Sequence, residues 1–255
     1  MEGSFLGVPG VDGWLFAAFA AASFCTAFLG LLMGAAGGLV LLALMALAFP
    51  PAVLIPMHTV VQLGVASSRT LMMWRYVMRN TLLPFTAGTA VGAAAGAQVF
   101  VALPTTALQA ILAAFILAVT WLPTLGRVGS LGGRFAALGF GATFLGMFVS
   151  STGTLLAPFI ASANPDRRGY IATLATQMAI VHIAKLVAFG VLGTAFGAYL
   201  PLALAMVCTA ALGNMAARRV LDRMPERTFR TVLKLVLTAL ALRLLWIAAK
   251  SAGWA

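Results

Sequence analysis

Apolar residues gather into eight long runs along the chain, and charged residues or Pro and Gly separate one run from the next. The runs lie at 14–49, 52–68, 80–101, 106–123, 135–163, 169–191, 196–216 and 231–249. Six of them are close to the roughly 20 residues that a helix needs to cross the hydrocarbon core of a membrane. The pattern therefore predicts an all-α polytopic membrane protein.

The runs 14–49 and 135–163 are too long for one crossing. As a single helix, the first would extend about 54 Å, against a hydrocarbon core of about 30 Å. Each contains residues that weaken a helix: Gly34-Ala-Ala-Gly37-Gly38 in the first and Ser150-Ser-Thr-Gly-Thr154 in the second. Non-helical backbone within a membrane is tolerated only where protein or a water-filled cavity surrounds it. We therefore expect each long run to form a re-entrant hairpin of two half-length helices, which leaves six crossings.

Composition removes the soluble alternatives. Hydrophobic residues make up 62% of the 255 residues and charged residues only 8%, and the mean hydropathy is +1.06. A soluble domain carries about 25% charged residues, so a soluble enzyme or a nucleic-acid-binding module is excluded. The two cysteines, Cys25 and Cys208, both lie in apolar runs, which argues against a disulfide framework.

The net charge of +11 carries information about topology. Most of the 16 Lys and Arg residues fall into four clusters: Arg69/Arg75/Arg79, Arg127/Arg134, Arg167/Arg168 and Arg218 to Lys234. Six crossings and two hairpins place all four clusters on one side, whereas eight crossings would divide them, and basic loops are typically cytoplasmic. We therefore expect the N-terminal segment 1–13 outside and a cytoplasmic linker at 125–134.

The two long runs belong to an internal duplication. A shift of 116 residues aligns 24–42 with 140–158, with six identities in 19 positions. The aligned Phe and Gly residues of Phe24-Cys-Thr-Ala-Phe-Leu-Gly30 carry most of this match. Further along the chain, a shift of 115 pairs Gln62 with Gln177. The sequence therefore predicts two related halves.

These halves are repeat 1 at 14–124 and repeat 2 at 135–255, each with one re-entrant hairpin and three crossings. Because three is an odd number, the second copy enters the membrane from the opposite face. Inverted repeats with paired broken helices are typical of secondary transporters, whose binding site lies near the midplane between the repeats. The expected fold is therefore an all-α bundle of two inverted repeats.

At these breaks the sequence resembles the sulfite exporter TauE/SafE family of membrane permeases. The resemblance covers nearly the whole chain and is carried by the doubled small-residue turn, Gly34-Ala-Ala-Gly37-Gly38 and Ser150-Ser-Thr-Gly153-Thr154, followed by Pro158. The family usually has a richer glycine cluster in both halves, and here hydroxyls replace glycines in the second. The resemblance implies a permease that moves sulfite, organosulfonates and related small anions across the bacterial inner membrane.

The two breaks are the first candidate site. Half-helix N-termini present unpaired N–H groups and the positive end of the helix dipole, and both attract anions. The candidates at the breaks are Gly37, Gly38, Ser150, Ser151, Thr152, Gly153 and Thr154. The alternative is that these small residues only allow helices to pack closely, as in Gly88-x-x-x-Gly92-x-x-x-Gly96.

Polar residues inside two apolar runs are the second candidate site. They are Gln177, His182 and Lys185 in 169–191, and His58, Thr59 and Gln62 in 52–68. A lysine inside a bilayer costs about 2.5–3.5 kcal/mol and normally faces a cavity or a partner. No Asp or Glu lies in any apolar run, so a bound anion could neutralise Lys185. The alternatives are that Lys185 snorkels to the headgroups and that His58 is interfacial.

The broken helices and buried polar residues predict a secondary transporter of a small anion that works by alternating access. The resemblance implies that the anion is a small sulfur oxyanion or organosulfonate, and that it is exported across the bacterial inner membrane. The alternative is an anion channel built on the same broken helices. We expect no enzyme activity, cofactor, metal or nucleic acid. The expected partners are the small anion and the lipid bilayer, and the sequence leaves open whether the protein is a monomer or a homodimer.

Overall fold

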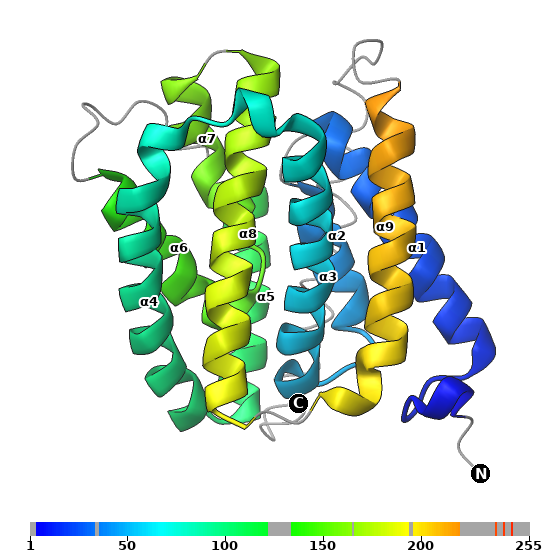
Figure 1. The fold of residues 1–255 in the computed structure, drawn as a ribbon. Coiled ribbons are helices and arrows are strands. Elements are labelled where there is room, and N and C mark those ends of the chain that lie inside the picture. Colours follow the sequence, from blue (N-terminus) through cyan, green and yellow to red (C-terminus); the bar gives the residue numbers. More distant parts are fainter. Residues whose placement is uncertain are drawn as a thin grey trace.

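The computed structural model describes residues 4–33, 36–121, 134–164, 166–193 and 196–219, together with the single positions Thr238, Leu242 and Trp246. Every regular element in this part of the chain is helical. The long helices stand side by side and run between an upper and a lower end of the molecule (Figure 1). The predicted all-α class is therefore confirmed.

Along the chain, the described helices fall into two groups, one before residues 122–133 and one after them. The first contains α1 (Gly13–Met33), α2 (Ala36–Met45), α3 (Pro51–Met73), α4 (Leu82–Ala102) and α5 (Thr105–Trp121). The second contains α6 (Arg134–Val149), α7 (Gly153–Ala163), α8 (Arg167–Val191) and α9 (Leu200–Arg218). Four short 3-10 turns accompany them: η1 (Phe5–Gly7), η2 (Trp74–Tyr76), η3 (Arg79–Thr81) and η4 (Gly197–Tyr199).

Local sequence signals set several helix boundaries. Pro51 stands in the first turn of α3, where its missing N–H leaves no hydrogen bond unmade. The carboxylate of Asp166 caps α8 by accepting a hydrogen bond from the Gly169 amide at 2.7 Å. Asp12 accepts in the same way from the Leu15 amide, at 2.7 Å, at the start of α1. Both acidic residues in the described part of the chain therefore serve as helix caps.

Five of the described helices are long and apolar enough to cross a membrane: Gly13–Leu32, Pro51–Tyr76, Arg79–Ala102, Arg167–Val191 and Gly197–Arg218. Four of them correspond to the predicted crossings at 52–68, 80–101, 169–191 and 196–216. The crossing expected at 106–123 forms α5, which has 17 residues and is shorter than the others. The crossing expected at 231–249 falls largely outside the described residues.

Both long apolar runs are broken where the sequence predicts, but their arms are unequal. In the first run, α1 has 21 residues and α2 has 10. In the second, α6 has 16 and α7 has 11. The expectation of two half-length helices was therefore wrong for α1, which at about 31 Å matches a full hydrocarbon core. The reason is that α1 is helical through every residue before the glycine-rich break, whereas α2 ends at Met45, before the apolar run itself ends.

The basic residues gather at one end of the molecule. In Figure 1 the end of α3, the start of α8 and the end of α9 all lie at the upper end, whereas α1 and α3 both start at the lower end. Arg75 and Arg79 follow α3, Arg167 begins α8, and Arg218 ends α9. The first broken segment thus returns to the end from which it entered, and the described bases agree with the predicted one-sided distribution.

Close contacts between glycines and neighbouring backbones hold the bundle together. α4 packs extensively on α6, because Gly88 and Gly92 bring the two backbones so close that a Cβ atom would overlap the Ala136 and Phe140 carbonyls. α1 packs on α9 in the same manner, with Gly213 against the Phe24 carbonyl. These glycines act in helix packing, as expected for small residues in membrane helices. The two interfaces flank a central contact between α3 and α8.

A cluster of apolar side chains fills the lower half of the bundle. It includes Ile55 and Met57 near the start of α3, Phe189 near the end of α8, and Phe100 at the end of α4. The ring centroids of Phe100 and Phe189 lie 5.4 Å apart in an edge-to-face arrangement. This layer of buried aromatic and aliphatic side chains forms the apolar core of the lower half.

Candidate functional site

Polar side chains at the second helix break form a buried group, which we call the Ser150 cluster (Ser150, His58, Thr59 and Lys185). The Ser150 Oγ atom lies 3.0 Å from His58 Nδ1 and 3.2 Å from Thr59 Oγ1. It also accepts a hydrogen bond from Lys185 Nζ at 3.2 Å. All four residues are at most 1% exposed. The cluster joins α3, α8 and the second break at one point.

The hydrogen bonds of the Ser150 cluster extend to the first break. His58 Nε2 lies 3.0 Å from the carbonyl oxygen of Gly38, which can only accept, so Nε2 carries the hydrogen. In the neutral ring Nδ1 then accepts from the Ser150 hydroxyl, while that hydroxyl's oxygen accepts from Lys185. A chain of hydrogen bonds thus runs from Lys185 through Ser150 and His58 to Gly38, and it links α2, α3 and α8.

The backbone at Ser150 has an uncommon conformation that places this hydroxyl. Its φ angle is +58°, in the left-handed region where residues other than glycine are strained. The helix α6 ends at Val149, and Ser151 and Thr152 continue without helical structure until α7 begins. Strain of this kind persists only where the surrounding structure holds it. Here the contacts of Ser150 with α3 and α8 supply that restraint.

A cavity of about 60 Å³ lies next to the Ser150 cluster, between α1, α2, α3, α7 and α8. We call it the tip cavity, because Gly37, Gly38, Ser151 and Gly153 of the two breaks line it. Its other polar lining residues are Thr26, Gln62, Arg69, Tyr170 and His182. A water molecule occupies roughly 10–15 Å³ on this scale, so the tip cavity has room for about four to six waters or one small anion.

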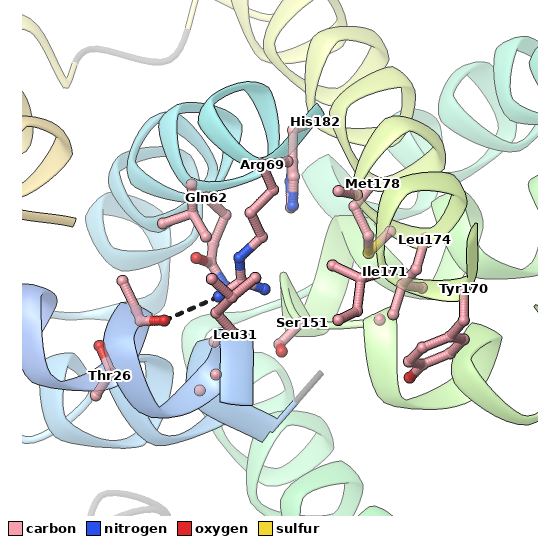
Figure 2. Close-up of a pocket in the computed structure, with 18 residues that line it drawn as sticks. Thr26, Leu31, Gln62, Arg69, Ser151, Tyr170, Ile171, Leu174, Met178 and His182 are labelled. Carbon is pink, nitrogen blue, oxygen red and sulfur yellow. Dashed lines mark hydrogen bonds between the residues drawn. The ribbon is translucent and has the colours of Figure 1, made fainter. Parts of the chain in front are cut away.

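Arg69 supplies the positive charge of the tip cavity. Its Nε donates to Asn214 Oδ1 at 3.0 Å, and its Nη2 donates to the Ala27 carbonyl at 3.0 Å. Asn214 is fully buried and is itself held by hydrogen bonds to the Val65 carbonyl and to Ser68. Figure 2 shows the guanidinium reaching from α3 into the space beside Gln62 and Leu31. The two described acids, Asp12 and Asp166, are engaged as helix caps, so neither pairs with Arg69.

The structure divides the residues predicted from the sequence into groups. Six line the tip cavity: Gly37, Gly38, Gln62, Ser151, Gly153 and His182. Four form the Ser150 cluster behind it: His58, Thr59, Ser150 and Lys185. Thr152 and Thr154 lie in the second break and the first turn of α7, and their hydroxyls have no hydrogen-bond partner among the described residues. The two remaining alternatives, an interfacial His58 and a snorkelling Lys185, do not fit, because both side chains are fully buried.

Gln177 is the predicted residue that the structure places elsewhere. Its side-chain amide donates to Thr81 Oγ1 at 3.1 Å, near the start of α4, and it does not line the tip cavity. Leu174, Met178 and His182 of α8 line the tip cavity at intervals of four residues. Gln177 precedes Met178 by one residue, and one residue turns a helix by about 100°, so the Gln177 side chain meets another neighbour.

The two glycines of the first break differ in what surrounds them. A Cβ atom on Gly37 would overlap the Thr26 carbonyl, so Gly37 allows α2 to pack closely on α1. A Cβ atom on Gly38 would instead overlap the side-chain amide of Gln62. Close packing therefore accounts for Gly37, whereas Gly38 leaves space for a polar side chain at the edge of the tip cavity.

Arg69 is the site residue that the sequence reasoning missed. Because it lies near Arg75 and Arg79, it was grouped with the bases that determine topology. One signal could have revealed it: the shift of 116 residues that aligns the two breaks pairs Arg69 with Lys185. The shift of 115 residues used for the polar positions pairs Lys185 with Thr70 instead.

A bundle of long apolar helices that surrounds a polar cavity at two helix breaks defines a multi-pass membrane transport protein. The family model for the sulfite exporter TauE/SafE family matches residues 19–244, and the chain belongs to this family. Members of the family are membrane transporters of sulfur compounds, and the chain is a transport protein of this class. No curated protein and no solved structure matches the chain.

Proposed function

We propose that the protein is a secondary transporter that exports a small sulfur oxyanion or organosulfonate across the bacterial inner membrane by alternating access. The observation that carries this proposal is the tip cavity, in which Arg69 presents a positive charge that no described carboxylate pairs with. A cation in such an enclosed place attracts an anion much more strongly than it would in water. A bound anion is therefore the natural counter-charge.

The donors around the tip cavity suit a sulfonate or sulfite group. Such a group presents two or three oxygens that accept hydrogen bonds in different directions. Arg69, the Gln62 amide, the Ser151 hydroxyl and the His182 ring can donate to these oxygens from α3, the second break and α8. Hydrogen bonds between charged partners are about twice as strong as neutral ones, so Arg69 is expected to dominate the affinity.

The helix pattern supports two repeats, at 14–124 and 135–255. A shift of 116 residues moves the bounds of α2 to 152–161, of α3 to 167–189 and of α4 to 198–218. These ranges coincide closely with α7 (Gly153–Ala163), α8 and α9. The packing corresponds as well, because α1 on α9 is the counterpart of α6 on α4. In Figure 1, α3 rises and α8 descends, as inverted copies would.

The position of the tip cavity supports a cytoplasm-facing state. Its lining includes Arg69, near the end of α3, and Tyr170 and Ile171, near the start of α8. These two helix ends lie at the end of the bundle that carries the basic residues (Figure 1). By the positive-inside rule this end, with the linker 125–134, faces the cytoplasm, and segment 1–13 lies outside. The apolar cluster around Phe100 and Phe189 closes the opposite half. A polar cavity toward one end and an apolar core toward the other favour an alternating-access transporter over an open anion channel.

Flux measurements in proteoliposomes test the proposal. Sulfite, taurine and other organosulfonates are supplied on one side, and uptake of labelled substrate is measured with and without unlabelled substrate inside. A transporter shows saturable flux that internal substrate accelerates, because the return of the loaded site is faster than that of the empty one. Flux that rises linearly with concentration and is indifferent to internal substrate would identify a channel. Absence of flux for every sulfur anion would refute the proposal.

A further inference from the structure

Two basic residues inside the bundle, the partly buried Arg69 and the fully buried Lys185, occupy corresponding positions in the two halves of the sequence. They are 116 residues apart, and this is the shift that aligns α3 with α8. Arg69 of α3 lines the tip cavity, and Lys185 of α8 belongs to the Ser150 cluster next to it. Neither has a carboxylate partner among the described residues, because Asp12 and Asp166 cap helices.

The surroundings of the two residues correspond as well. A Cβ atom on Gly30 of α1 would lie 3.0 Å from Arg69 Nη2. A Cβ atom on Gly146 of α6 would lie 3.6 Å from Lys185 Cδ. Gly30 and Gly146 are also 116 residues apart. Each basic side chain therefore lies against the matching glycine, on the first arm of the broken segment in its own repeat.

The two basic residues differ in access and in what they bind. Arg69 lines the tip cavity and is held at its rim by Asn214 and the Ala27 carbonyl. Lys185 is 0% exposed, and Ser150 is its hydrogen-bond acceptor. An ammonium group has three N–H donors, so this single acceptor leaves the amine poorly satisfied among the described residues. The residue that corresponds to Asn214 in the first half is Gln98, which is exposed, so the two sites are not held in the same way.

We propose that Arg69 and Lys185 are two alternating sites for the same anion, one for each side of the membrane. In the present conformation Arg69 serves the cytoplasmic side, and Ser150 occupies the place of the anion at Lys185. When the repeats exchange conformations, the anion leaves Arg69, displaces Ser150 and is bound by Lys185 on the outer side. This inference rests on the proposed transport function and specifies how its site works.

The inference predicts that the two basic residues act on opposite sides. In inside-out and right-side-out vesicles from expressing bacteria, Arg69→Met should raise the half-saturating sulfite concentration at the cytoplasmic face. Lys185→Met should raise it at the outer face. Loss of one hydrogen-bonded ion contact corresponds to about a 10- to 100-fold change in affinity. At the opposite face, each variant should stay within about twofold of the unmodified protein, because the site there is intact.

Arg75→Met is the matched control, since it removes a base at the same end of the bundle that is exposed and stacked over Trp74 at 5.8 Å. It should change neither face. The inference is overturned if both substitutions weaken the same face, or if each weakens both faces equally. If the unmodified protein moves no sulfur anion, the proposed function fails first, which is a separate result.

A binding measurement covers the case in which a variant carries no flux. Sulfite is titrated against purified protein, and the rise in melting temperature is recorded. In the cytoplasm-facing conformation, Lys185→Met should retain the sulfite-dependent rise, whereas Arg69→Met should lose it. Equal loss in both variants would show that the two residues share one site, and would refute alternation.

Discussion

The two ends of the central helix pair, α3 and α8, have opposite character. Toward the upper end, Arg69 of α3 and Tyr170 of α8 line a cavity between five helices. Toward the lower end, the same two helices meet around Lys185, Ser150 and a layer of Phe side chains, all of which are buried. Arg69 and Lys185, which the predicted duplication pairs at a shift of 116 residues, therefore lie in different environments. The difference teaches that positions alike in sequence can be placed differently by the packing of the whole bundle.

The largest effect should follow from removing the positive charge of Arg69 in the tip cavity. Arg69→Met should reduce sulfite flux in proteoliposomes about 10- to 100-fold, because the charge-assisted contact with the anion is lost. Arg75→Met, an exposed base on the same side, should leave flux within about twofold. Equal losses in the two variants would mean that Arg69 acts through general surface charge.

Removing a large side chain from the apolar lower half should reduce the stability of the protein more than its affinity for substrate. Phe189 is fully buried against Phe100, and Phe189→Ala should lower the free energy of unfolding by about 3–5 kcal/mol. Thermal unfolding in detergent measures this loss. Substrate affinity at the cytoplasmic face should change little. A stable Phe189→Ala protein would indicate that the lower half is less tightly packed than described.

A smaller loss of stability should follow from removing the Ser150 hydroxyl, which joins α3 to α8. Ser150→Ala leaves Lys185 and His58 without their shared partner, at a cost of about 1–3 kcal/mol in unfolding free energy. Ser151→Ala, one residue later and lining the tip cavity, is the matched control for a lost hydroxyl. Ser150→Ala should be the less stable of the two, and the reverse order would contradict the role of the Ser150 cluster.

The smallest effect distinguishes two glutamines that the sequence treats alike. Gln62 lines the tip cavity, and Gln177 binds Thr81 outside it. Gln62→Leu should raise the half-saturating sulfite concentration about three- to tenfold, as expected for one hydrogen bond. Gln177→Leu should leave this concentration unchanged and should lower the melting temperature instead. The opposite assignment would place the substrate on the other face of α8.

Much of the fold could be read from the sequence, because a bilayer restricts what an apolar run can do. The positions of four long helices and of both breaks were predicted correctly, since length and small residues decide them locally. The equal arms were wrong, because α1 is helical up to the break whereas α2 ends at Met45, before its apolar run ends. The paired orientation of the repeats and the bounds 14–124 and 135–255 stay predictions.

The candidate site was less predictable than the fold, because the partner of a polar side chain depends on which helices pack against it. Lys185 and His58 were chosen because polar groups in apolar runs require a partner, and both lie buried beside Ser150. Gln177 met the same criterion and found Thr81. Arg69 was assigned to the loops, because it directly follows the apolar run 52–68. The sequence did not reveal that α3 continues to Met73, or that a hydrogen bond to Asn214 holds the Arg69 side chain inside the bundle.

The sequence by itself determined the class of protein, the two breaks and the scarcity of acidic residues that makes an anion the expected counter-charge. These follow from composition and local spacing, which the bilayer converts directly into helices. Only the tertiary structure decided which basic residue lines the cavity and which is occluded. That choice depends on contacts between α1, α3, α8 and α9, and segments so far apart in the chain meet only when the whole bundle has packed.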